Sequence, residues 1–170
     1  VDTVLAQREQ VVRGLPEPIG AALYWPWLRT TANRLQPPCG HVAGVYARRD
    51  AQAGVHRAPA NEELFGVLDL EVAVDAGHQD RLNPEGVNCL RALPGRGIRV
   101  WGSRTLSRDP AWRHVSVRRT FLALQRWVDL ALGATAFEAN GPALWMRVQR
   151  ELETHLTELW QAGALKGAFA

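Results

Sequence analysis

The side chains that could hold a metal ion are the cysteines and histidines, because thiolate and imidazole are common metal ligands. The candidates for one site are Cys39, His41, His56, His78 and Cys89. Their spacings match no recognised ligand set, and histidines scattered in this way are usually surface or capping groups. The two cysteines lie fifty residues apart without a CxxC pair, which is typical of reduced, buried thiols. We therefore expect no metal site and no cofactor.

Hydrolytic chemistry would need an activated nucleophile or a pair of carboxylates. The chain has no GxSxG nucleophile elbow, and Ser103 is a loop serine beside an expected strand. The carboxylates that lie near one another in the sequence are Asp69, Glu71, Asp75 and Asp80. Solvation and salt bridges account for such residues more often than an acid–base pair does. The sequence therefore predicts no catalytic residue, and nothing in it demands catalysis.

A glycine-rich segment at 94–97, with the sequence PGRG, would be a phosphate cradle only if a lysine and a serine or threonine followed at a helix start. They do not, so we interpret the segment as a structural turn. Pro94 fixes φ, while Gly95 and Gly97 permit backbone angles that a side chain would forbid. Apolar runs flank the turn on both sides, so we predict a strand pair here, at the centre of a sheet.

Arginine carries almost all of the positive charge, since only one of the 20 basic residues is a lysine. Arginines and tryptophans are interleaved in one helical region, which contains Trp112, Arg113, Arg118, Arg119, Arg126 and Trp127. A nucleic-acid patch would need these residues on one exposed face, and solvated helix arginines are more common. The net charge of +3 suits an acidic protein surface equally well. An arginine-rich nucleic-acid-binding module is therefore the alternative function.

The chain has 170 residues, 46% of them hydrophobic, which favours one core and a single domain. No stretch approaches the ~20 uninterrupted apolar residues of a membrane helix, so we expect no membrane insertion. The N-terminus has neither the basic nor the apolar region of a signal peptide. It also lacks a methionine, which leads us to expect a piece of something longer.

Periodicity predicts an α/β (α+β) domain built on a mixed sheet. About four strands are expected, at 21–24, 67–74, 87–93 and 98–101. Pro26 cannot donate to a ladder, so the first strand should lie at an edge or end near Tyr24. Four main helices should pack the sheet, at 1–15, 39–51, 115–132 and 142–162, with a short helix at 76–81. The helix at 115–132 should lie across the sheet.

The last helix has recognisable ends and an apolar face. Asn140 can serve as its N-cap, with Pro142 in the first turn and Gly163 after the last turn. The residues it should bury are Leu144, Val148, Leu152, Leu156 and Leu159.

Seven segments of the chain carry specific motifs. They are YWPWL (24–28), PPCGHVAGVYARRD (37–50), GVHRAPAN (54–61), LNPEGVNCLR (82–91), PGRGIRVWGSRTLSRDPAWRHVSVRR (94–119), FEANGPALW (137–145) and LWQAGALKGAF (159–169). In this order they closely resemble the C-terminal domain of bacteriophage contractile-tail sheath proteins. Related sheaths occur in R-type bacteriocins and other phage-tail-like contractile injection systems. The combination of PPxGHVAGVYAR with PGRGIRVWGxRTL is highly specific.

The resemblance implies a structural subunit rather than an enzyme. Many copies of a sheath protein form a helical sleeve around an inner tube, and contraction of the sleeve drives the tube through a target envelope. The implied partners are other sheath subunits, the inner tail-tube protein, and baseplate and terminator proteins, with no nucleic acid. The implied location is a virion tail or phage-tail-like particle, assembled in the bacterial cytoplasm.

In this family the C-terminal domain lies toward the tube, and terminal arms add strands to the sheets of neighbouring subunits by β-augmentation. Residues 1–170 resemble this domain without the outer N-terminal domains and without the exchanging arm, so unpaired sheet edges are expected. Charge complementarity predicts that exposed arginines of the last two helices face acidic patches on the tube or on neighbouring subunits. These candidate contacts are Arg118, Arg119, Arg126, Arg147 and Arg150.

Overall fold

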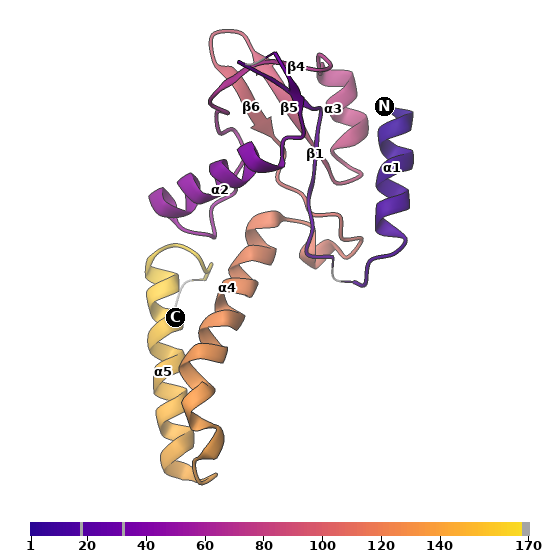
Figure 1. The fold of residues 1–170 in the computed structure, drawn as a ribbon. Helices are drawn as coiled ribbons and strands as arrows, with labels where there is room; N and C mark the ends of the chain where they lie inside the picture. Colours follow the sequence, from indigo (N-terminus) through magenta and orange to yellow (C-terminus); the bar gives the residue numbers. More distant parts are fainter. Residues whose placement is uncertain (18, 32, 168–170) are drawn as a thin grey trace. The chain divides into compact units, whose positions relative to one another are not determined.

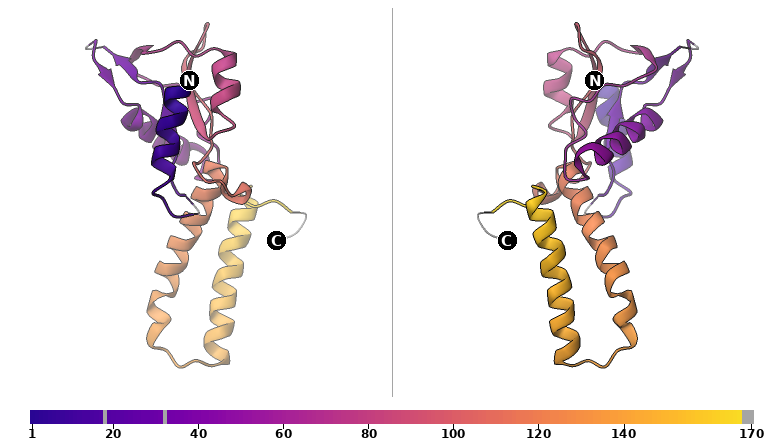
Figure 2. Two further views of the ribbon diagram at one scale, coloured as in Figure 1. Left: turned by 90° about the vertical axis from the view of Figure 1, so that its right-hand side faces the viewer. Right: turned by 90° about the vertical axis from the view of Figure 1, so that its left-hand side faces the viewer.

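The computed structural model of the chain describes residues 1–17, 19–31 and 33–167. They form two compact units, Val1–Arg119 and Thr120–Ala170, and each is described by itself. All of the strands in the described ranges belong to the first unit, whereas the second is built from helices (Figures 1 and 2). The mixture of helices and strands confirms the predicted α/β class.

The first sheet contains β1 (Leu23–Trp25), β5 (Val87–Leu93) and β6 (Gly97–Trp101), in the order β1-β5-β6. The sheet is mixed, as predicted, because β1 runs parallel to β5 and β6 runs antiparallel to it. β1 lies at an edge and ends directly before Pro26, which has no N–H to donate. The strand pair around the 94–97 turn therefore supplies the central strand.

A second sheet, with the order β3-β2-β4, is antiparallel. Its strands are β2 (Leu28–Thr30), β3 (Leu35–Gln36) and β4 (Val67–Leu70). The single four-stranded sheet of the sequence prediction is thus divided, and the strand expected at 67–74 ends at Leu70 and pairs with β2. The strands β2 and β3 have three and two residues, which is too short for a periodic pattern to show.

Three helices pack against the strands of the first unit: α1 (Asp2–Val12), α2 (Cys39–Ala53) and α3 (Ala76–Leu82). The helices predicted at 1–15, 39–51 and 76–81 are present with slightly different ends. α2 ends at Gly54, whose φ of 85° is open to glycine and rare for other residues. In Figure 1, α1 and α3 lie on one side of the strands and α2 lies on the other.

The core lies on both faces of β5. Toward α1 and α3 it contains Val4, Val74, Leu82, Val87 and Cys89. Toward α2 and the second sheet it contains Leu28, Val42, Val45, Leu64, Leu70, Leu90, Ile98 and Val100. Val87 and Cys89 of β5 serve one layer and Leu90 serves the other, which explains why both faces of the strand are buried.

The chain leaves the first unit through η1 (Pro110–Trp112) and α4 (Val115–Leu132). Asp109 caps η1, since its carboxylate accepts the N–H of Ala111 at 2.9 Å. Residues 115–119 of α4 belong to the first unit, and the rest of the helix belongs to the second. The predicted packing of α4 across the sheet concerns both units and stays a prediction.

The second unit continues with η2 (Gly133–Phe137) and α5 (Pro142–Gln161), which runs back beside α4 (Figures 1 and 2). The rings of Trp127 and His155 stack between the two helices, with centroids 3.9 Å apart and planes 7° apart. The N-cap of α5 is Gly141, so the prediction of Asn140 is wrong. The amide oxygen of Asn140 instead accepts the indole N–H of Trp145 at 2.7 Å.

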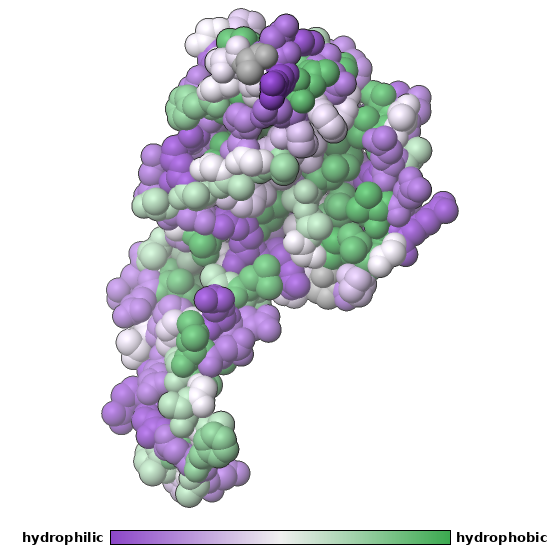
Figure 3. Space-filling view, viewed as in Figure 1, coloured by the Kyte–Doolittle hydropathy of each residue, from purple (hydrophilic) through white to green (hydrophobic). Residues whose placement is uncertain are grey.

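No residue in the described part of the second unit, 120–167, is fully buried. The prediction that α5 buries its apolar face is therefore wrong. Four of its five predicted core leucines and valines are half-buried, and Leu156 is exposed. Helical spacing indicates which face is apolar, but two helices alone cannot cover such a face. Apolar residues accordingly appear among polar ones on the surface in Figure 3.

Candidate contact surfaces

Asp75, one of the carboxylates at 69–80, is the N-cap residue of α3. Its carboxylate accepts the backbone N–H of His78 at 2.8 Å and lies 2.7 Å from the Nδ1 atom of the same residue. These two hydrogen bonds, the backbone one first, hold the pKa of Asp75 below its ordinary value. A general acid needs a raised pKa, whereas an ionised carboxylate suits the N-cap of α3. Asp75 therefore has a structural role.

The two cysteines are free thiols in different environments. Cys89 is buried in β5, and burial raises its pKa to about 11, so the thiol stays protonated at neutral pH. Cys39 is exposed, so the prediction of a buried thiol is wrong there. The reason is its position at the first residue of α2, before the buried face of that helix begins.

Across 1–17, 19–31 and 33–167, no group of three or more His, Cys, Asp or Glu side chains is placed to hold a metal ion. No helix within these ranges combines the length and the apolar character that crossing a membrane requires.

The turn at 94–97 joins β5 to β6 and places Leu93 opposite Gly97. Gly95 and Gly97 have φ values of 69° and 73°, in the left-handed region that glycine allows. A Cβ atom on Gly97 would also lie 2.6 Å from a carboxylate oxygen of Glu63. Both glycines are therefore fixed by the geometry of the hairpin.

Asn88 is a buried polar residue that the sequence predictions leave out. Its side-chain N–H groups donate to the carbonyl oxygens of Leu23 (3.1 Å) and Arg104 (2.7 Å). Its side-chain oxygen accepts the N–H of Arg104 at 2.7 Å, and Gly102 leaves space for it. Asn88 thus connects β1, β5 and the segment after β6. An asparagine inside an apolar strand run is the signal that could have identified it, because a buried amide requires partners.

Two of the five candidate arginines, Arg118 and Arg119, belong to the first unit and contact other residues of that unit. Arg119 donates two hydrogen bonds to the carboxylate of Asp50, one of them at 2.8 Å, and these bonds raise its pKa. Its guanidinium also lies 4.6 Å from the ring centroid of Tyr46. Arg118 lies over the ring of Trp112 at 5.1 Å. Both side chains are half-buried, where the sequence predicted exposure, and they hold the start of α4 in the first unit.

The other three candidates, Arg126, Arg147 and Arg150, lie in the second unit and are exposed. Arg147 forms an ion pair with Glu138, and the hydrogen bond in this pair raises the pKa of Arg147. In the described part of the chain, Arg126 and Arg150 form no ion pair. These two guanidinium groups are therefore free to meet a partner.

The first sheet has one covered edge. Beside β6, the N–H of Val100 donates to the carbonyl of Glu62 (2.9 Å), and the N–H of Leu64 donates to the carbonyl of Ile98 (2.8 Å). Along the opposite edge, β1 has no strand beside it in the described ranges. β1 is therefore the edge of this sheet to which a further strand can be added.

Large apolar side chains are exposed on both units. In the first unit they include Trp27, Leu35, Phe65 and Leu68, and in the second Phe121, Leu122, Leu130, Phe137, Trp145 and Met146. Leu130 is 72% exposed and Phe137 is 100% exposed.

Comparison with known sequences points to one family. A family model for the phage tail sheath protein central domain matches residues 18–106. The tail sheath protein of Burkholderia phage BcepMu is 33% identical over 107 residues, covering 59% of this chain and 22% of the relative. The tail sheath protein of Vibrio phage KVP40 is 27% identical over 137 residues, covering 78% of this chain and 20% of the relative. The chain thus spans about a fifth of the length of these relatives.

Solved contractile injection systems contain similar chains. One is the sheath complex of the extracellular contractile injection system PVC in the contracted state, with a TM-score of 0.88, 36% identity, and coverage of 98% of this chain and 48% of that chain. Another is the helical sheath of the anti-feeding prophage in the contracted state, with a TM-score of 0.83, 42% identity, and coverage of 92% and 46%. A chain of the anti-feeding prophage baseplate also has a TM-score of 0.83, with 43% identity and coverage of 86% and 40%. The resemblance seen in the sequence is confirmed, and the chain belongs to the phage tail sheath protein family.

Proposed function

We propose that the chain is part of a contractile sheath subunit, which polymerises around an inner tube and contracts to drive the tube through a target envelope. The observation that carries this proposal is the match to the contracted PVC sheath, with a TM-score of 0.88 over 98% of the chain. The family is one of structural sheath proteins, which supports a structural role and not a catalytic one. Because the chain covers only 48% of that sheath protein, the activity of the whole subunit is part of the proposal.

Within such a subunit, residues 1–170 would be the tube-proximal C-terminal domain. The motifs at 94–119 and 159–169 support this placement, whereas the family model that matches residues 18–106 describes a central domain of the sheath protein. Its partners would be other sheath subunits, the tube protein, and baseplate and terminator proteins. Similarity to a chain of the anti-feeding prophage baseplate supports the baseplate contact. The particle would be a virion tail or a phage-tail-like particle, assembled in the bacterial cytoplasm.

The open edge of β1 is where the arm of a neighbouring subunit would add a strand. The edge at β6 is already bonded to residues 62–64, so it cannot accept an arm without releasing them. A proline in place of Tyr24 would remove a backbone N–H from β1, and it would also remove the hydroxyl that bonds Tyr46. Tyr24→Phe is therefore the matched control, and a loss of sleeve formation beyond that of Tyr24→Phe would support the β1 edge. A matched proline at Leu68 would remove a backbone N–H from β4, and its effect on sleeve formation tests the edge of the second sheet.

Among the five candidate arginines, Arg126 and Arg150 are the strongest candidates for contact with an acidic tube surface. Both are exposed, whereas Arg147 is paired with Glu138 and the other two contact the first unit. The double variant Arg126→Glu, Arg150→Glu in the full-length subunit should weaken co-sedimentation with the tube, most strongly at low salt. The control is Arg57→Glu, an exposed arginine of the first unit. Unchanged tube binding by all five charge reversals would contradict this part of the proposal.

Electron microscopy of the purified full-length protein tests the proposed function itself. Sleeves, alone or on co-expressed tubes, are the expected result. The relatives above are sheath and baseplate proteins and give no support to nucleic-acid binding. A salt-dependent shift on DNA, together with an absence of sleeves, would instead favour the nucleic-acid module.

A further inference from the structure

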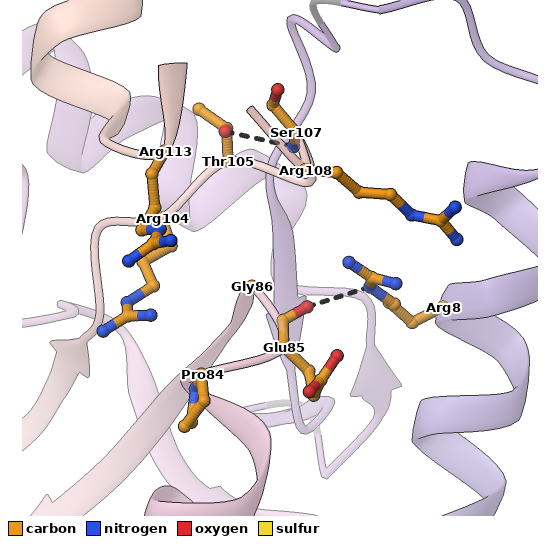
Figure 4. A pocket seen from close by; sticks show the side chains of 9 residues that line it. All are labelled: Arg8, Pro84, Glu85, Gly86, Arg104, Thr105, Ser107, Arg108 and Arg113. Atoms are coloured by element: carbon orange, nitrogen blue, oxygen red, sulfur yellow. Dashed lines mark hydrogen bonds between the residues drawn. The ribbon is translucent and has the colours of Figure 1, made fainter. Parts of the chain in front are cut away.

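A polar cavity of about 180 Å³ lies in the first unit, at the end of the first sheet where β5 begins. Figure 4 shows its lining, with Arg8 from α1, Gly86 from the turn before β5, and Arg104, Arg108 and Arg113 from the segment after β6. In this view Arg104 and Arg113 lie together on one side, and Arg8 and Arg108 lie on the other. A cavity lined by four guanidinium groups favours an anion.

Close backbone packing holds the cavity open in a fixed shape. Gly86 has a φ of 81°, and a Cβ atom there would lie 2.6 Å from the carbonyl oxygen of Thr105, so only glycine fits. Thr105 is held in turn by two bonds. Its N–H donates to the carbonyl of Arg113 at 2.8 Å, and its hydroxyl donates to the carbonyl of Trp112 at 2.7 Å. The backbones of Arg104 and Arg113 are therefore positioned before any partner arrives.

Arg8 and Arg108 already share a carboxylate. Arg8 is only 6% exposed, and its Nε–H donates to the carbonyl of Glu85 at 2.9 Å. It also pairs with Glu9, and Arg108 pairs with the same carboxylate at 3.0 Å. Glu9 thus serves two guanidinium groups. Glu85 also lines the cavity, so four arginines face two carboxylates and an excess of positive charge remains.

Arg104 and Arg113 are different, because neither side chain has an ion pair or a hydrogen bond to any residue in the described ranges. Two like charges held beside each other repel. An oxyanion between them would remove the repulsion and accept charge-assisted, bidentate hydrogen bonds. The guanidinium N–H groups of these two residues therefore mark the place where such an oxyanion would bind.

We propose that this pocket binds one carboxylate side chain of a neighbouring copy of the sheath subunit. The proposal rests on the sheath function above and names one contact within it. The cavity is smaller than the ~300–1,000 Å³ of sites for whole small molecules, so an aspartate or glutamate side chain fits it better than a nucleotide does. A second copy is the source because similar chains are solved as helical sheaths. Helical assemblies need heterologous contacts, in which a pocket on one copy meets a different surface of the next.

Cross-linking in the full-length subunit tests the identity of the partner. Pro84 lines the pocket without contributing charge, so a photo-reactive amino acid at this position leaves all four arginines in place. Irradiation of assembled sleeves should attach it to a peptide of the sheath subunit that contains Asp or Glu, as mass spectrometry would show. A cross-link to the tube protein, or to no chain, would overturn the proposal.

Assembly assays test the role of the charges. The double variant Arg104→Gln, Arg113→Gln should raise the critical concentration for sleeve formation about tenfold or more. The double lysine variant keeps the charge and should assemble much more readily, and Arg34→Gln, an exposed arginine elsewhere in the unit, should behave as wild type. Millimolar inorganic phosphate should compete with the carboxylate and inhibit assembly. Normal assembly of the glutamine variant, or a requirement for phosphate, would contradict the proposal.

Wild-type protein distinguishes a failure of the proposed pocket contact from a failure of the proposed sheath function. Sleeves of wild-type protein, together with unaffected glutamine variants, would leave the sheath function intact and remove only the pocket contact. Failure of the wild-type protein to form sleeves would instead count against the sheath function itself.

Discussion

Asn88 links β5 to two other segments of the first unit through its side-chain hydrogen bonds. It is fully buried, and its side chain bonds Leu23 in β1 and both backbone groups of Arg104. The variant Asn88→Ala would leave these groups buried without partners. We expect it to lower the free energy of unfolding by about 2–4 kcal/mol, measured by urea denaturation.

Two variants isolate the effect of these hydrogen bonds. Asn83→Ala, at a half-buried asparagine outside the strand, should cost much less. Asn88→Asp should cost at least as much as alanine, because a carboxylate would face the carbonyl oxygens of Leu23 and Arg104. A loss at Asn88→Ala no larger than that at Asn83→Ala would show that the bonds are not important for stability.

Glu17 gives the first unit a dependence on pH. Its carboxylate accepts the N–H of Arg108 (3.0 Å) and the hydroxyl of Ser107 (2.6 Å), and these bonds hold its pKa below the ordinary value of 4.5. A carboxyl whose pKa is lower in the folded state stabilises that state above the unfolded pKa. This stabilisation is lost as the pH falls through the folded pKa.

The melting temperature should therefore distinguish Glu17→Gln from the wild type most clearly above pH 5. We expect the difference between them to shrink as the pH falls below about 4.5. The control is Glu71→Gln, since the Glu71 carboxylate has no hydrogen bond in the described part of the chain. A difference that stays constant between pH 3 and pH 7 would contradict the assigned bonds.

A small polar network joins α2 to the start of α4. The Tyr24 and Tyr46 hydroxyls are 2.5 Å apart, Arg119 lies over Tyr46, and Arg119 pairs with Asp50. The side chains of Arg119 and Asp50 are 24% and 26% exposed, so water screens this pair only partly. A double-mutant cycle with Asp50→Asn and Arg119→Gln should give a coupling energy of about 1.5–3 kcal/mol.

The ion pair between Arg147 and Glu138 is the matched comparison. Its side chains are 46% and 40% exposed, so solvent screening should make its coupling energy clearly smaller. Equal coupling energies for the two pairs would show that burial of the Arg119 pair has no effect.

The elements also show what the sequence can predict. The β5–β6 hairpin was predictable because the two turn glycines and their apolar flanks act locally. β2 and β3 were not, because pairs of two or three residues have no period and form only through long-range partners. β4 therefore appeared to belong to the central sheet. Among the candidate sites, the arginines were predictable by type, but the engagement of Arg119 with Asp50 depends on a contact across 69 residues of chain.

The second unit exposes large apolar side chains, among them Phe137 and Met146, that its own helices do not cover. Met146 is 60% exposed and Phe137 is 100% exposed. If the sheath function is correct, sleeve formation should cover this surface.

A thiol introduced as Met146→Cys, in a Cys39→Ser background, tests whether the surface becomes covered. We expect this thiol to react with a maleimide at least about tenfold more slowly in sleeves than in free full-length subunits, because burial at an interface excludes water and reagent. A thiol at Gln52, on α2, is the control for the first unit. Slow labelling in free subunits would show that another part of the same chain already covers Met146. Equally fast labelling in sleeves and in free subunits would show that this surface is not a contact between copies.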